Sequence, residues 1–145
     1  MPAKKPPASA SVTQAEYETL ASFRHTLRQF LHFSETAARD SGIAPQQHQA
    51  LLAIRGFSGP GPITIAELAG HLQVRHHSAV GLVDRLVKQK LVKRTREAED
   101  RRRIHLALTA RGDRVLGNLS ALHKDQIRRI IPGLTAALRK LSKAV

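Results

Sequence analysis

Cysteine and tryptophan are absent from the sequence, and aromatic residues make up only 3% of its 145 residues. Without cysteine there can be no disulfide, no thiolate metal site and no cysteine redox switch. Long apolar runs are also lacking, since none approaches the roughly 18–20 residues that a membrane-spanning helix needs. No apolar stretch follows Lys4 and Lys5, which argues against a secretory signal. We therefore expect a cytoplasmic protein with no membrane partner.

Acidic residues are the other shortage, because 11 Asp and Glu stand against 24 Lys and Arg. The formal net charge of +13 implies self-repulsion in the compact state, and such an excess indicates a polyanionic partner. DNA, RNA and an anionic membrane surface are the candidates, and the short apolar runs argue against the membrane. A hydrophobic content of 41% is typical of a globular chain.

The first residues differ in composition from the rest of the chain. Residues 1–13 are rich in Pro, Ala, Ser and Lys and offer almost nothing to bury. We predict a disordered basic tail there. The length that remains suits one core, so we predict a single domain over residues 14–145.

Two helices are expected before the first glycine-rich loop. A capping box from Thr13 to Glu16, followed by apolar residues at three-to-four spacing, predicts a helix over about 13–40. Pro45 suits the first turn of a second helix, which should end at Gly56. The apolar side of that second helix is expected to consist of Leu51, Leu52 and Ile54.

A helix-turn-helix is expected after that loop, which spans residues 56–62. A second capping box, Thr64 to Glu67, opens a short helix, and the chain breaks near residues 73–75. A further helix should end near Lys90. Its core-facing residues are expected to be Ala79, Val83, Leu86 and Val87.

A β-hairpin is predicted next. Apolar and basic residues alternate over 91–96, and Ile104, Leu106 and Leu108 alternate strictly with less apolar residues, as in a half-buried strand. The charged segment 97–103 between them is the expected turn. Three short helices followed by a hairpin describe a winged helix-turn-helix, so the fold class is mainly α with a small β wing (α+β).

The C-terminal part predicts two further helices. Thr109 should cap a helix to about residue 130, Pro132 and Gly133 should break it, and a last helix should end near Ser142. Their apolar residues are too many for the small central core and call for a partner surface, although a monomer could use them to cover its own domain. They are Leu116, Leu119, Leu122, Ile127, Ile130, Ile131, Leu134, Leu138 and Leu141.

Cationic residues fall where a winged helix meets DNA. A helix fits the major groove of B-DNA, and a hairpin beside it can follow the phosphate backbone. The expected contacts at the start and on the non-core side of the recognition helix are Arg75, His76, His77, Ser78, Arg85 and Lys88. In the hairpin, basic residues precede and follow the turn, and the alternative interpretation is a merely solvated charged loop. These residues are Lys93, Arg94, Arg96, Arg101, Arg102 and Arg103.

Residues 100–112 read D-R-R-R-I-H-L-A-L-T-A-R-G and match the wing pattern D-R-R-x-x-x-L-x-L-T-x-x-G of the multiple antibiotic resistance regulator (MarR) family. The segments 65–69, 82–86 and 91–94 resemble the helix-turn-helix of that family and the strand that enters its wing. The resemblance covers about residues 16–143, and the wing motif is its most specific part.

The resemblance implies a role for each matching wing residue. Arg102 would enter the minor groove, Asp100 would orient it through a salt bridge, and Arg101 and Arg103 would contact phosphates or be solvated. In that family the terminal helices of two chains interlock. This implies a winged helix-turn-helix over about 45–110 and dimerisation helices over about 14–40 and 110–143.

A two-fold dimer would present its recognition helices to palindromic half-sites roughly 34 Å apart. The resemblance therefore implies a dimeric, sequence-specific transcriptional regulator of double-stranded DNA, and most often a repressor. It also implies release by a small aromatic or anionic effector, for which we assign no ligand site. The alternative is an architectural winged-helix protein that binds DNA or RNA without sequence preference, which the net charge of +13 favours.

Four residues depart from the family pattern. Arg75 stands where a capping Ser or Thr is common, and Ala44 likewise replaces a capping Thr. Gly81 replaces a larger base-reading residue. Lys90 occupies the usual position of a C-terminal glycine, where the left-handed conformation is uncommon for other residues.

Enzymatic and metal-binding functions find no support in the sequence. No nucleophile–base pair, paired acids or phosphate loop stands out, so we expect no enzyme and no cofactor. His25 and His32 lie two turns apart on one helix, but no H-x-x-x-H pair occurs and thiolates are absent, so we assign no metal site.

Overall fold

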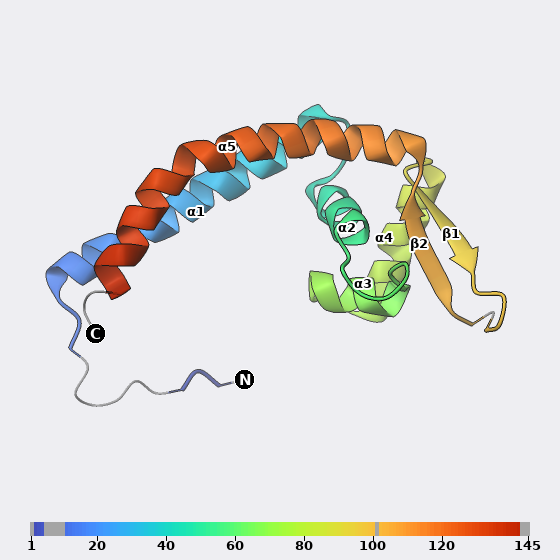
Figure 1. Cartoon of the computed structure of the whole chain (residues 1–145), viewed down its shortest axis with the longest axis horizontal. Coiled ribbons are helices and arrows are strands. Elements are labelled where there is room, and N and C mark those ends of the chain that lie inside the picture. Colours follow the sequence, from blue (N-terminus) through green and yellow to red (C-terminus); the bar gives the residue numbers. More distant parts are fainter. Residues whose placement is uncertain (1, 5–10, 101, 143–145) are drawn as a thin grey trace. The chain divides into compact units, whose positions relative to one another are not determined.

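The computed structural model describes residues 2–4, 11–100 and 102–142. The helices and strands follow one another as α1 (Gln14–Asp40), α2 (Pro45–Arg55), α3 (Ile65–Leu72), α4 (His76–Lys88), β1 (Val92–Arg96), β2 (Ile104–Leu108) and α5 (Ala110–Ser142) (Figure 1). The predicted mainly helical fold with one antiparallel hairpin is confirmed. None of the described helices is both long and apolar enough to cross a bilayer.

The chain divides into two compact units. One consists of residues 33–124, which we call the winged unit, and the other of residues 1–32 and 125–145, which we call the helical unit. The winged unit is larger than the predicted segment 45–110, because the end of α1 and the start of α5 contribute buried side chains to its core. These side chains are Ala37, Ala38, Leu116 and Leu119.

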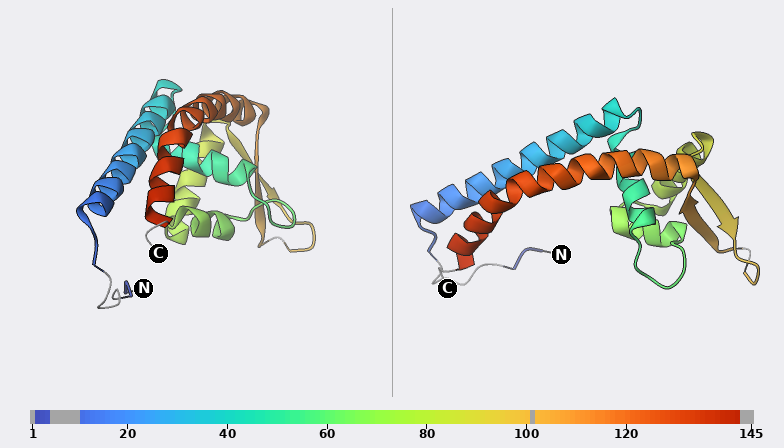
Figure 2. Two further views of the ribbon diagram at one scale, coloured as in Figure 1. Left: turned by 60° about the vertical axis from the view of Figure 1, so that its left-hand side comes forward. Right: turned by 45° about the horizontal axis from the view of Figure 1, so that its top comes forward.

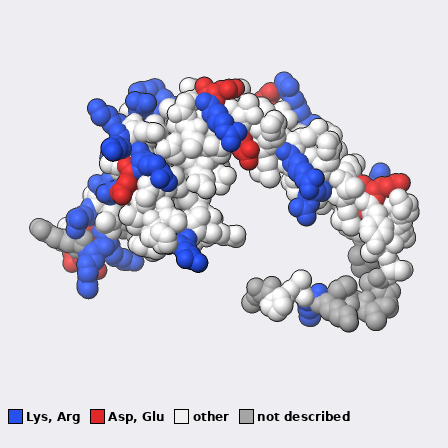
Figure 3. All heavy atoms as spheres, turned by 180° about the vertical axis from the view of Figure 1, so that it is seen from behind, with Lys and Arg blue, Asp and Glu red and all other residues white. Residues whose placement is uncertain are grey.

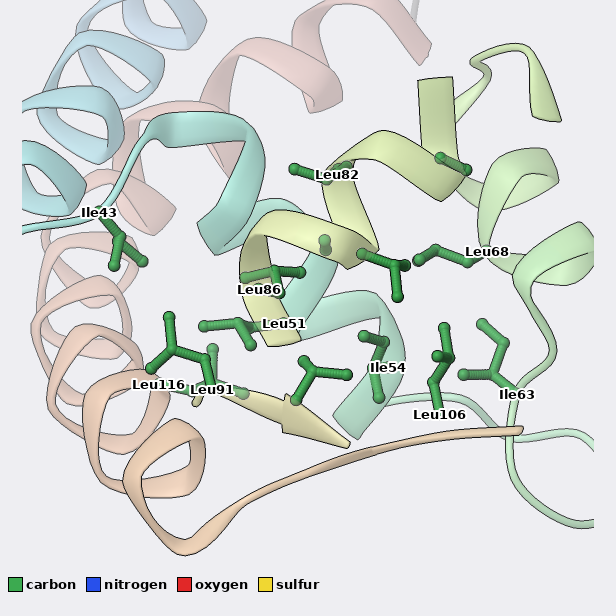
Figure 4. Close-up of a cluster of buried hydrophobic side chains, with 14 of the residues drawn as sticks. Ile43, Leu51, Ile54, Ile63, Leu68, Leu82, Leu86, Leu91, Leu106 and Leu116 are labelled. Carbon is green, nitrogen blue, oxygen red and sulfur yellow. The ribbon is translucent and has the colours of Figure 1, made fainter. Parts of the chain in front are cut away.

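The core of the winged unit is formed by apolar side chains from every one of its elements (Figure 4). One prediction for this core is wrong: Leu52 is 53% exposed, whereas its neighbour Leu51 is fully buried. Successive helix residues lie about 100° apart, and the buried face of α2 follows Leu51 and Ile54, so Leu52 points to solvent. The most deeply buried large residues are Leu51, Ile63, Leu68, Leu86, Leu91, Leu106 and Leu119.

Two histidines lie against each other in the winged unit. The ring centroids of His48 in α2 and His123 in α5 are 4.7 Å apart, and His48 is 4% exposed. The His123 ring lies between the hydroxyl of Ser34, 2.8 Å from its Nε2, and the carbonyl oxygen of Leu119, 2.7 Å from its Nδ1. Burial lowers the pKa of His48, and the neighbouring His123 lowers it further. The fold therefore favours the neutral form of His48.

Both predicted capping boxes are confirmed. The backbone N–H of Glu16 donates to Thr13 Oγ1 over 3.1 Å, and that of Thr13 donates to Glu16 Oε1 over 3.0 Å. At the start of α3, the Glu67 N–H donates to Thr64 Oγ1 over 3.2 Å, while Thr64 N–H donates to Glu67 Oε1 over 3.3 Å. Each box satisfies amide groups that the first turn of a helix leaves without intrahelical partners.

The unusual residues at other helix ends behave as the sequence predicts. Ala44 provides no side-chain cap, but Gln47 Oε1 accepts its N–H over 2.8 Å. Arg75 is the N-cap of α4 and makes no side-chain cap. Lys90 has a φ of +61°, the left-handed conformation expected at this position. Gln73 ends α3 in the same conformation, with a φ of +55°, which the sequence pattern did not indicate.

The two strands pair from Val92 opposite Leu108 to Arg96 opposite Ile104. The segment before α3 lies along the outer edge of β2, since the Leu106 N–H donates to the Ile63 carbonyl over 2.9 Å. In both views of Figure 2 the strands extend together beyond helices α2–α4 and end in the wing turn. The segment before α3 thus attaches the hairpin to the helix-turn-helix.

Helix α5 is continuous through Pro132, so the predicted break at Pro132 and Gly133 is wrong. A proline inside a helix removes one N–H···O bond and crowds the carbonyl four residues earlier, here that of Arg128. The flanking residues are mostly Leu, Ala, Ile and Arg, which tolerate a helix well, and both breakers are exposed. A single lost hydrogen bond therefore does not end the helix.

The described residues of the helical unit include no fully buried side chain. Its parts of α1 and α5 run side by side in both views of Figure 2, and a groove of about 380 Å³ between them is lined by residues of both helices. Leu116 and Leu119, for which a partner surface was predicted, instead pack in the winged unit. The large apolar residues that the helical unit leaves exposed are Val12, Tyr17, Leu20, Leu31, Ile127, Ile131 and Leu138.

Candidate nucleic-acid interface

Helix α4 has one buried and one exposed face. The predicted contact residues all lie on the exposed side of the helix or at its start: Arg75, His76, His77, Ser78, Arg85 and Lys88. The residues that fix this orientation are the buried Ala79, Leu82, Val83 and Leu86. The helix is thus anchored by its apolar stripe and offers its polar stripe to a partner.

Gly81 lies at the centre of the exposed face. At 100° per residue, His77, Gly81 and Lys88 fall within a narrow sector opposite the buried stripe. A Cβ built on Gly81 would meet no atom within 4 Å, so packing does not require glycine here. The missing side chain lets a bound surface approach the helix backbone closely.

An acidic residue on the same helix is paired with a cation. Asp84 Oδ1 accepts a hydrogen bond from Arg94 Nη2, which connects α4 to β1. Unpaired, Asp84 would repel phosphate groups. Sequence reasoning missed this pair, because its two residues lie on different elements and share no periodic pattern. It assigned Arg94 only to the cluster of basic hairpin residues.

The wing turn brings Asp100 and Arg102 together. Asp100 Oδ1 accepts the backbone N–H of Arg102 over 3.0 Å and lies 3.4 Å from its Nε. The Arg102 side chain is nevertheless 94% exposed, so its guanidinium is free of packing against the unit. Arg101, which was predicted to contact phosphate, lies outside the described residues.

Arg103 belongs to a second group, at the point where the wing turn joins the two strands. Its Nη1 lies 4.0 Å from Glu97 Oε2, and the same carboxylate oxygen lies 3.4 Å from His105 Nε2. His105 Nδ1 lies 3.1 Å from the carbonyl oxygen of Pro62. The sequence pattern marks His105 only as an alternating strand residue, and no spacing rule connects it to Pro62.

One groove brings the recognition helix and the wing together. It has a volume of about 370 Å³ and lies between the start of α3 and the hairpin. His76 lines it from α4, and Arg102 and Arg103 line it from the wing. Residues that the sequence assigned to major-groove and minor-groove contacts thus border the same hollow.

A second hollow of about 470 Å³ lies along α4 on the side of α2. It brings His77, Ser78 and Arg85 together, as well as Gly81. Gln46 and Gln49 of α2 complete its polar lining, and sequence reasoning did not single out either residue. Amide side chains offer both donors and acceptors, which suits contact with base edges or phosphates.

Cationic side chains gather over the hairpin end of the winged unit, at the left of Figure 3. The two strands and their turn contain six basic residues against three acidic ones. Three of the acidic side chains at this end are paired with cations: Asp84 with Arg94, Glu97 with Arg103, and Asp100 with Arg102. The surface therefore has a positive potential that suits a polyanion.

Among the described residues, no group of three or more His, Asp or Glu side chains could hold a metal ion. The interface offers exposed hydrogen-bond donors and positive charge. The exposed donors there belong to arginine, lysine, histidine, serine and glutamine.

Comparisons with known proteins agree with this geometry. A sequence model described as MarR family matches residues 41–103. The HTH-type transcriptional repressor MdtR of Bacillus subtilis is 30% identical over 94 residues, which cover 65% of this chain and 59% of MdtR. The chain spans about half the length of the curated relatives that it matches.

Solved structures share the fold over most of the chain. RV1404 from Mycobacterium tuberculosis is 26% identical with a TM-score of 0.71, covering 95% of this chain and 98% of that one. The fold also matches that of MepR of Staphylococcus aureus in its complex with DNA, at 18% identity and a TM-score of 0.66, covering 93% of this chain and 100% of that one. A MarR-family sequence model thus matches the helix-turn-helix and most of the wing of this chain, and the solved structures show that the winged fold is shared over most of its length.

Proposed function

We propose that this chain is a sequence-specific, DNA-binding transcriptional regulator that binds a palindromic operator as a homodimer and represses transcription. The observation that supports it most directly is the groove bordered by His76 of α4 and by Arg102 of the wing. An exposed recognition helix and an exposed wing arginine at one hollow suit simultaneous contact with adjacent grooves of a duplex. The names of two relatives add support, since MdtR is a repressor and MepR was solved bound to DNA.

In this proposal Arg75, His76, His77, Ser78, Arg85 and Lys88 contact bases and phosphates in the major groove. Arg102 enters the minor groove, held by Asp100, while Arg101 and Arg103 bind phosphates. The proposal includes release of the protein from DNA by a small aromatic or anionic effector. Only the family resemblance supports this part.

The dimer is proposed from the helical unit. Its described side chains include none that is fully buried, and seven large apolar residues are at least 41% exposed there. Exposed apolar surface on this scale marks an interaction site. A second copy that packs its own α1 and α5 against this surface would bury it. Sedimentation equilibrium should therefore give twice the chain mass, and Ile131→Glu should shift the protein toward the monomer.

A competition experiment tests the function. A fluorescent duplex is taken from the DNA upstream of the gene that encodes this chain. Its binding is challenged with the same duplex unlabelled or with a scrambled duplex. At physiological salt, a specific regulator should prefer its own site by at least ~10³. Equal competition by the scrambled duplex would contradict this and favour the second candidate, a sequence-blind architectural protein of DNA or RNA. The net charge of +13 is the observation that favours that candidate.

A further inference from the structure

We propose that His105 is a positioning residue for the wing, and that it attaches the hairpin to the segment before α3 most firmly when its ring is protonated. The proposal rests on the proposed function, because its consequence is a DNA affinity that depends on the protonation of His105. His105 would not touch DNA. It would act on the wing arginines through Glu97 and Pro62.

The two ring nitrogens of His105 both face acceptors. Nδ1 lies 3.1 Å from the Pro62 carbonyl oxygen, which can only accept, and Nε2 lies 3.4 Å from the carboxylate oxygen Oε2 of Glu97. A neutral imidazole has one N–H and can donate to one of these partners. The imidazolium has two and can donate to both. The geometry therefore suits the protonated ring better than the neutral ring.

The backbone of His105 lies at the middle of three segments. It is paired with Thr95 of β1 on one side and forms a β-bridge with Thr64 on the other. Its side chain is only 21% exposed, so water screens its contacts less than those of a surface ion pair. The ring thus connects the segment before α3, β2 and Glu97, where the wing turn begins.

The charged groups around the ring come from three directions. Glu97 favours the imidazolium, while Arg103 Nη1, 4.0 Å from that carboxylate, opposes it and shares the carboxylate. On the side of α3 the charged residue is Glu67, whose Oε1 accepts hydrogen bonds from both the N–H and the hydroxyl of Thr64. When His105 loses its proton, its ring can donate only one of the two hydrogen bonds. Glu97 then keeps Arg103 as its cationic partner.

The contacts of His105 bear on DNA binding through the order of the wing. Arg102 precedes Arg103 directly, and its long side chain is 94% exposed. A wing that is held through both ring nitrogens of His105 has fewer conformations to lose on binding. The loss of conformational freedom is a large part of the free-energy cost of association. Proton uptake by His105 should thus strengthen binding without adding a contact to DNA.

The test measures the affinity of the full chain for the upstream duplex, by fluorescence anisotropy at constant ionic strength. The wild type is compared with His105→Gln, Glu97→Gln and the double variant. Between about pH 8 and about pH 6, the wild type should gain at least ~3-fold more affinity than His105→Gln. Glu97→Gln should lose the same pH-dependent gain, and the double variant should lose no more than either single one. His25→Gln, on α1 in the helical unit, is the matched control and should keep the wild-type profile.

Parallel pH profiles for wild type and His105→Gln would overturn the proposal, since exposed histidines such as His76 and His77 would then account for the whole dependence. A second readout needs no DNA. The Leu106 N–H donates to Ile63 beside the His105 ring, so its hydrogen-exchange protection factor should be higher at about pH 6 than at about pH 8 in the wild type. His105→Gln should remove that difference. A protein that ignores duplex DNA but shows this change would contradict the proposed function alone, and unchanged protection would contradict the role of His105.

Discussion

Gly112 of α5 lies directly against the backbone of Leu91, the residue before β1. A Cβ built on Gly112 would stand 2.1 Å from the Leu91 carbonyl oxygen. That carbonyl accepts the N–H of Thr109, whose own hydroxyl donates to Lys90 O over 2.6 Å and accepts the Gly112 N–H over 3.0 Å. The T-x-x-G part of the wing motif is therefore the joint that attaches the hairpin to α5.

Gly112→Ala should destabilise the protein by about 2–4 kcal/mol, because a methyl group cannot occupy the space of a backbone carbonyl. Urea denaturation followed by circular dichroism measures this loss. Gly117→Ala in the same helix is the matched control, since a Cβ there meets no atom within 4 Å. It should raise the stability by up to about 1 kcal/mol. Equal effects of the two variants would contradict the close contact at Leu91.

Arg94→Ala should weaken DNA binding by more than the loss of one phosphate contact would, because it leaves the Asp84 carboxylate unpaired on the recognition helix. The double variant Asp84→Asn/Arg94→Ala should recover part of that loss. Both side chains are more than a third exposed, so the effect on folding should stay within about 1 kcal/mol. Anisotropy and urea denaturation separate the two effects. No recovery in the double variant would show that Arg94 acts only as a phosphate ligand.

Arg102→Ala should cost about 1–3 kcal/mol of binding and change the base preference beside the recognition-helix site. Asp100→Ala should also weaken binding, although it removes a negative charge, because the arginine loses its hydrogen-bonded partner. Lys93→Ala, a change of a strand cation, should weaken binding about equally for all sequences. Anisotropy titrations measure the affinity of each variant, and selection of bound duplexes from a random pool measures its base preference. Tighter binding by Asp100→Ala would mean that the carboxylate is a repulsive surface charge.

Stability should fall on acidification because of His48. Its pKa is lowered in the fold, by burial and then by His123, while the unfolded chain has the usual value near 6.5. Below that value the unfolded state binds more protons than the folded state, so the contribution is complete above it and declines as the pH drops. The free energy of unfolding at several pH values should decrease less steeply in His48→Gln than in the wild type. Identical slopes would assign the acid sensitivity to other groups.

The features that the sequence predicted well are those encoded locally. Each capping box, the one at Thr13 and the one at Thr64, joins two residues that lie about one helical turn apart. Each box can therefore be recognised from four consecutive residues. The alternation in 104–108 and the charged segment before it locate the hairpin within a few residues. The left-handed Lys90 followed from its place in the helix-turn-strand pattern of the family.

The features that it missed depend on which segments meet in space. The exposure of Leu52 follows from the direction in which α2 packs. The continuity of α5 through Pro132 follows from the summed preference of its neighbours, which one lost hydrogen bond does not outweigh. Pairs such as Asp84 with Arg94, or His105 with Pro62, join residues 10 and 43 positions apart on different elements, and no periodicity marks them.

Thr64 has two roles at once, since it caps α3 and also forms the bridge to His105 at the edge of the hairpin. The first turn of α3 and the middle of β2 are consequently joined through one residue. A fluctuation that opens either of them disturbs the other. Native-state exchange experiments should find that the amides of these two segments become accessible in a common cooperative opening, with similar slopes against denaturant concentration.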